Sequence, residues 1–141
     1  MTAQDITSVS GWIGFVLIGL EALFPYFLRR NRMSVWLGSV KIAAGAPYLK
    51  RMWPHYWLGY LLLLLSVIHT VVPIQARQLR GLNALGLWLA AGGLLFLLAQ
   101  SAIGWWLQDP SLIRRAPMRS WHYWLMFGVV ILVAVHVWLN G

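Results

Sequence analysis

The sequence contains no cysteine and only three acidic residues, and both shortages limit its chemistry. Without cysteine the chain cannot hold a Cys-ligated iron–sulfur cluster, a C-x-x-C-H haem attachment or a disulfide. With so few carboxylates it offers few of the hard oxygen ligands that divalent ions such as Mg²⁺ or Ca²⁺ prefer. Histidine is therefore the side chain left to ligate a metal or a haem, and the chain has four histidines.

Charged residues of either sign are scarce as well, while apolar residues are abundant. Of 141 residues, 60% are hydrophobic and 10% are charged, and the mean hydropathy is +0.70. This composition is typical of an integral membrane protein. Four apolar stretches reach spanning length. We therefore predict an all-α fold, a four-helix transmembrane bundle with up-down-up-down topology that forms a single domain over residues 1–141. The predicted helices are about 10–28, 54–74, 83–106 and 120–140.

The net charge of +8 is unevenly distributed along the chain. Nine of the eleven Lys and Arg residues lie in the connections that precede predicted helices 54–74 and 120–140, and two lie between 74 and 83. This asymmetry follows the positive-inside rule and indicates contact with lipid rather than with nucleic acid. It predicts that both termini lie outside, and we expect a bacterial or archaeal cytoplasmic membrane.

A tetrapeptide repeat marks two of the predicted helices. His-Tyr-Trp-Leu begins at His55 and again at His122, and in each case a second histidine follows fourteen residues after the first, at His69 and His136. Fourteen residues of α-helix rotate by roughly 1400°, about 40° short of four full turns, and rise about 21 Å. Both histidines of a helix therefore share one face but lie in opposite leaflets of the membrane.

Helices 54–74 and 120–140 run parallel in the predicted topology, so the histidines should meet in level pairs. His55 faces His122 in this arrangement, and His69 faces His136. We predict that the pairs are axial ligands of two non-covalent b-type haems held between the two helices. The alternatives are hydrogen-bonded packing histidines, a proton relay or a metal transporter.

With these pairs at this spacing, the chain resembles the four-helix, di-haem core of the cytochrome b family of quinol:cytochrome c oxidoreductases. It is also similar to the haem core of ferric reductases and NADPH oxidases. The resemblance implies the same two haems, and for the cytochrome b family it implies glycines fourteen residues apart in the helices without histidine. Here Gly14 is followed at that spacing by Leu28, and Gly86 by Gln100.

Three further residues are candidates for the site. Arg51 lies about one turn before His55, and Arg119 about one turn before His122. At these positions a guanidinium could bind a haem propionate. The alternative is that both arginines contact lipid phosphate and set the topology. Glu21 is the only acidic residue deep within a predicted span. It could carry a proton to or from a quinone, or hydrogen-bond a neighbouring helix as a neutral acid.

The function predicted from these features is transmembrane electron transfer. We expect a di-haem subunit linked to a quinone pool or to a partner redox subunit of a larger complex, and the sequence leaves open whether the chain is itself an enzyme. The alternatives are a free-standing quinol- or superoxide-linked oxidoreductase and a haem-free transporter or scaffold.

Overall fold

The structure, a computed structural model, describes residues 2–29, 52–77, 82–109 and 111–140, and the regular elements in these ranges are all helices. Each is long and apolar enough to cross a membrane, which supports a multi-pass integral membrane protein. The prediction of an all-helical chain with four spanning helices is confirmed. The helices are α1 (Ala3–Arg29), α4 (Trp53–Gln75), α5 (Ala84–Trp106) and α6 (Arg115–Asn140).

Two helices begin earlier than the apolar stretches predicted. Helix α1 starts at Ala3 because Thr2 and Asp5 cap it reciprocally: the Thr2 hydroxyl accepts from the Asp5 amide, and the Asp5 carboxylate accepts from the Thr2 amide. This exchange satisfies two amide groups at a helix start. Helix α6 starts at Arg115, and Pro117 is tolerated there because it lies in the first turn. Polar residues thus extend both helices beyond their apolar spans.

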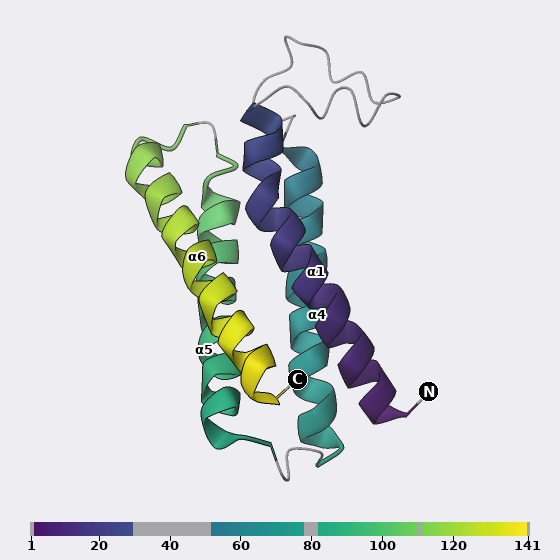
Figure 1. The fold of residues 1–141 in the computed structure, drawn as a ribbon. Coiled ribbons are helices and arrows are strands. Elements are labelled where there is room, and N and C mark those ends of the chain that lie inside the picture. Colours follow the sequence, from purple (N-terminus) through teal and green to yellow (C-terminus); the bar gives the residue numbers. More distant parts are fainter. Residues whose placement is uncertain (1, 30–51, 78–81, 110, 141) are drawn as a thin grey trace.

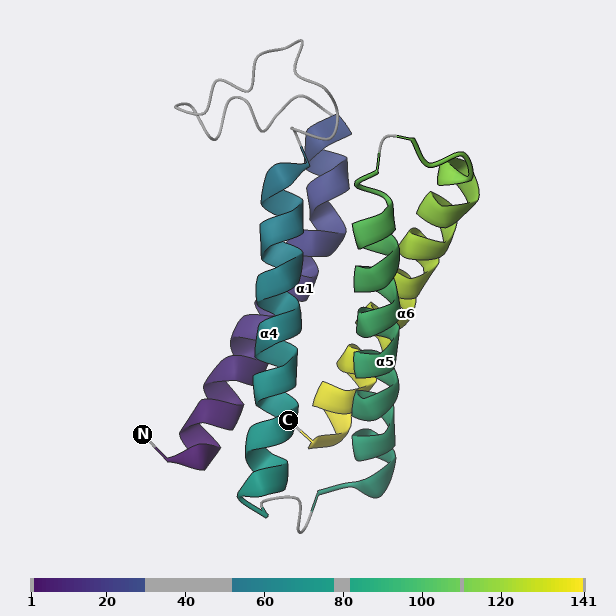
Figure 2. The same cartoon turned by 180° about the vertical axis from the view of Figure 1, so that it is seen from behind.

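The four helices form two closely packed pairs. Helix α1 packs along α4, and α5 packs along α6, whereas contacts between the two pairs are much sparser. The chain runs along α1, back along α4, then along α5 and back along α6, so α4 and α6 point the same way (Figure 1, Figure 2). The up-down-up-down topology and the parallel course of the two histidine-bearing helices are as predicted. Both termini lie at the same end of the bundle.

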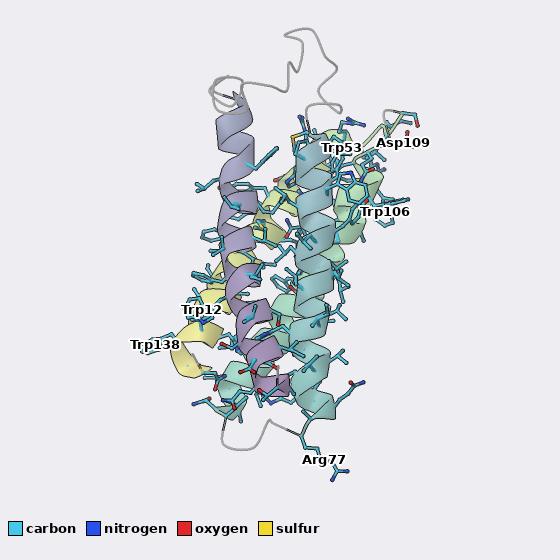
Figure 3. The ribbon with its side chains drawn as sticks, turned by 90° about the vertical axis from the view of Figure 1, so that its right-hand side faces the viewer. Trp12, Trp53, Arg77, Trp106, Asp109 and Trp138 are labelled. Atoms are coloured by element: carbon cyan, nitrogen blue, oxygen red, sulfur yellow. The ribbon has the colours of Figure 1, made fainter. Side chains whose placement is uncertain are left out.

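A small apolar core joins the two pairs, and the outer surface is apolar as well. The core cluster consists of Leu17, Ile18, Leu62, Leu97, Met126 and Val129. On the outside, Trp88 is 77% exposed and Trp138 is 82% exposed, and Figure 3 shows Trp12 and Trp138 projecting away from the bundle. Large exposed apolar side chains all around a helical bundle suggest contact with lipid.

Candidate functional site

The four histidines meet in two pairs across the space between α4 and α6. The ring centroids of His55 and His122 lie 6.1 Å apart with an interplanar angle of 83°. Those of His69 and His136 lie 6.3 Å apart at 84°. These are the pairs expected from the parallel helices. We refer to His55 and His122 as the His55 site, and to His69 and His136 as the His69 site.

Three of the histidines are held by a backbone carbonyl of the adjacent helix. The Nδ1 of His69 lies 2.8 Å from the Thr7 carbonyl oxygen on α1. On the other side, His122 Nδ1 lies 3.0 Å from the Gln100 carbonyl oxygen, and His136 Nδ1 lies 2.9 Å from that of Gly86, both on α5. A carbonyl only accepts, so Nδ1 must carry the proton and donate. In the neutral imidazole, Nε2 is then the nitrogen that can bind a metal.

The fourth histidine has a different partner. His55 Nδ1 pairs with the side-chain carboxylate of Glu21 on α1. The Glu21 side chain is only 4% exposed, and its second oxygen, Oε1, has no hydrogen-bond partner. Phe24, one turn further along α1, stacks against the His55 ring at a centroid distance of 5.8 Å. His55 is thus fixed by a buried acid and an aromatic ring of the same helix.

The partners of Nδ1 repeat the spacing of the histidines themselves. Thr7 and Glu21 on α1 are fourteen residues apart, and so are Gly86 and Gln100 on α5. Each pair of helices therefore supplies two histidines from one helix and two anchors from the other, at matching depths. In the sequence, Gly86 and Gln100 stand out only as an incomplete glycine pair. Their role as anchors depends on which helix lies beside α6, which the tertiary structure decides.

Glycine lets two of the histidines approach the neighbouring helix. A Cβ atom built on Gly11 would lie 2.7 Å from His69 Cε1, closer than real side-chain contacts. At Gly104 it would lie 3.2 Å from His122 Cε1. Both glycines lie four residues after the anchoring residue, so they occupy the next turn of the helix just beyond the accepting carbonyl. The accepting carbonyl and the glycine one turn later thus hold the same histidine ring against the neighbouring helix.

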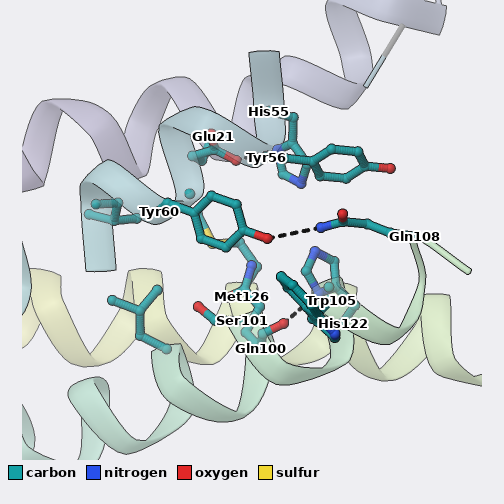
Figure 4. A pocket seen from close by; sticks show the side chains of 14 residues that line it. Glu21, His55, Tyr56, Tyr60, Gln100, Ser101, Trp105, Gln108, His122 and Met126 are labelled. Carbon is teal, nitrogen blue, oxygen red and sulfur yellow. Dashed lines mark hydrogen bonds and ion pairs between the residues drawn. The ribbon is translucent and has the colours of Figure 1, made fainter. Parts of the chain in front are cut away.

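A small pocket of about 50 Å³ opens beside the His55 site. Its lining comes from all four helices and includes both histidines of the site, Glu21 and Tyr56. Figure 4 shows Tyr60 and Gln108 pointing toward one another, and Gln108 Nε2 donates to the Tyr60 hydroxyl at 3.1 Å. This bond links α4 to the segment that follows α5.

An asparagine lies one turn beyond the His69 site. Asn140 follows His136 by four residues, and its Oδ1 accepts from the Asn83 amide at 2.8 Å. Its Nδ2 is buried without a hydrogen-bond partner and lies directly over Gly86, since a Cβ built on Gly86 would be 1.9 Å from it. Unpartnered buried donors are uncommon in folded proteins.

Of the three further candidate residues from the sequence, one lies in a histidine site. Glu21 lies in the His55 site, as described above. Arg119 is exposed near the start of α6, one turn before His122. Arg51 falls outside the described residues. Within the described ranges, no group of three or more His, Asp or Glu side chains gathers as a metal-ion site.

Comparison of the chain with protein-family models, with curated protein sequences and with solved structures finds no match.

Proposed function

We propose that the chain is a transmembrane di-haem b-type cytochrome that transfers electrons between the two faces of a membrane. The observation that carries this proposal is the common orientation of the four histidines. Every Nδ1 faces a partner on the neighbouring helix of its own pair, a backbone carbonyl for three histidines and the Glu21 carboxylate for His55, so each Nε2 lies on the opposite side of its ring. No Nε2 within the described ranges makes a hydrogen bond. Metal-ligating histidines are held in this way by their second nitrogen.

The separation of the rings fits an iron between them. A bond from imidazole to a first-row transition metal is about 2 Å, and Nε2 lies roughly 1.1 Å from the ring centroid, so two axial rings should have centroids roughly 6.2 Å apart. The two pairs have 6.1 Å and 6.3 Å. Two independent sites therefore have the spacing that bis-histidine ligation requires.

The number of ligands also favours haem over a bare metal ion. Each site offers two imidazoles, whereas a protein site for zinc normally supplies three or four side chains. Iron in a porphyrin already has four nitrogen ligands and needs two axial ones. The residues that would hold the haems are His55 with His122 and His69 with His136, and bound haem iron would supply one-electron chemistry. The buried Asn140 Nδ2 is a donor suited to a propionate at the His69 site.

The position of the two sites supports transfer across the membrane. They are separated by fourteen residues on parallel helices, which corresponds to about 21 Å along the bundle. The protein fixes their spacing through α4 and α6, and it excludes water between them with an apolar core. Electrons would enter from a quinol or from a partner redox subunit, and the His55 pocket, lined by Tyr60 and Gln108, is accessible from the bundle surface.

The proposal is tested by purifying the chain from haem-replete cells and measuring haem by the pyridine haemochrome method. We expect about two non-covalent protohaems per chain. The double variant His55→Ala/His122→Ala is expected to retain one, and the variant that lacks all four histidines none. A colourless wild-type preparation would overturn the proposal.

A further inference from the structure

The two histidine sites differ in one chemical respect, the acceptor bonded to the ligand histidines. Three of the four Nδ1 atoms donate to a neutral backbone carbonyl, at Thr7, Gln100 and Gly86. The fourth, on His55, pairs with the Glu21 carboxylate. The His69 site therefore has two carbonyl partners, and the His55 site has one carbonyl and one carboxylate.

A carboxylate changes a ligand histidine more than a carbonyl does. Charge-assisted hydrogen bonds are shorter and roughly twice as strong as neutral ones, and a carboxylate on Nδ1 raises the basicity of the imidazole. A more basic axial ligand donates more electron density to iron, and this stabilises the ferric state. Hydrogen bonding around a haem is one of the means by which proteins set its reduction potential.

Glu21 is buried beside His55. Its side chain is 4% exposed, and its carboxyl contacts the His55 Nδ1. In its carboxylate form, Glu21 would place a negative charge near the haem iron, which also favours the ferric state. Both effects act in the same direction, and both are confined to the His55 site because Glu21 is the only acidic residue deep within the described spans.

We infer that Glu21, acting through His55, lowers the reduction potential of haem at the His55 site below that at the His69 site, so electron transfer runs downhill from the former to the latter. This inference rests on the proposed function. It gives the chain a direction, from the end of the bundle where α4 and α6 begin toward the end that carries both termini. In the predicted membrane orientation, electrons move outward from the cytoplasmic side.

The test is a redox titration of the purified, haem-loaded chain, followed by its visible absorption. His136→Ala is used to leave the His55 site alone, and His55→Ala to leave the His69 site alone, so each potential is assigned. We expect the His55 site to have the lower potential. Glu21→Gln should raise that potential and leave the other unchanged, because glutamine keeps an acceptor oxygen for Nδ1 but removes the charge. The matched control is Gly19→Ala on the same helix, where an added Cβ meets nothing within 4 Å, and both potentials should equal those of the wild type.

Three results would overturn the inference. These are a His55 site with the higher potential, a Glu21→Gln variant whose potentials equal those of the wild type, and a shift confined to the His69 site. Glu21→Gln could fail to retain haem, and two other measurements then test the inference. The first is the order of the two wild-type potentials. The second is the variant Glu21→Asp, which keeps the carboxylate and should preserve that order. A chain without haem would instead contradict the proposed function, so the two failures are distinguishable.

Discussion

Among the residues that the structure describes, Leu62 of α4 and Val129 of α6 are the most completely buried large side chains, and each lies midway between the two histidines of its own helix. Leu62 is 2% exposed and Val129 is 1% exposed. Each is seven residues from both histidines, or about 10 Å along the helix axis. They belong to one apolar cluster, so the best-packed part of the bundle separates the two histidine sites.

This arrangement predicts that the middle layer stabilises the bundle. Leu62→Ala should destabilise the chain by about 2 to 4 kcal/mol. The substitution leaves a cavity in the core, and the side chains around it lose packing contacts that lipid cannot replace. Leu64→Ala is the control, since Leu64 is 57% exposed on the same helix. Thermal unfolding in detergent, followed by circular dichroism, measures the difference. Equal effects of the two substitutions would contradict the packing described for this layer.

The pairing of the histidines predicts which substitutions share a phenotype. His69→Ala and His136→Ala should each remove the same haem and leave the other bound, because both act on the His69 site. His55→Ala and His122→Ala should remove the other haem. Haem content and the absorption bands of the reduced variants measure this. If His69→Ala and His136→Ala affected different haems, the facing pairs would be wrong.

The close approach of His69 to α1 predicts that a single added methyl group weakens haem binding at the His69 site. Gly11→Ala places a Cβ 2.7 Å from His69 Cε1, so the ring must move away from the Thr7 carbonyl. Loss of such an anchor typically lowers metal-site affinity roughly 10- to 100-fold. Haem retention at the His69 site during competition with apomyoglobin measures the change. Gly19→Ala, which meets nothing within 4 Å on the same helix, should behave as the wild type.

The charge distribution predicts the orientation of the chain. A protease site fused at Gly141 should be cut from outside the cell. One inserted beside Ile113, which is 98% exposed between α5 and α6, should be cut only after the membrane is opened. Cleavage in the opposite order would show that the positive-inside rule fails for this chain.

The proposed function predicts a requirement for an electron donor from outside the chain. Haem in vesicles should be reduced by a quinol or by a co-purified redox subunit, and removing either histidine site should stop transfer to the far side. The purified chain should not be reduced rapidly by NADH, because the sequence has no nucleotide-binding glycine motif. Rapid reduction by NADH, or turnover of a substrate without a partner, would favour a free-standing oxidoreductase instead.

Much of the bundle follows from the sequence because membrane-spanning helices are encoded locally. In lipid every backbone polar group must be paired within the segment, so an apolar stretch of spanning length forms a helix whatever its neighbours are. The spacing of His55 and His69, and of His122 and His136, then places each pair on one face. Four alternating spans make α4 and α6 parallel, and this brings the histidines together in level pairs. The sequence alone was sufficient for these features.

The partners of the histidines required the tertiary structure. Backbone carbonyls of Thr7, Gly86 and Gln100 have no signature in sequence, because any residue provides a carbonyl and only the packing of neighbouring helices selects one. Glu21 was a candidate for proton transfer or for a hydrogen bond between helices, but its pairing with His55 depends on how α1 is rotated against α4. The periodicity of a helix determines which residues share a face, whereas close packing between helices determines which atoms of that face meet.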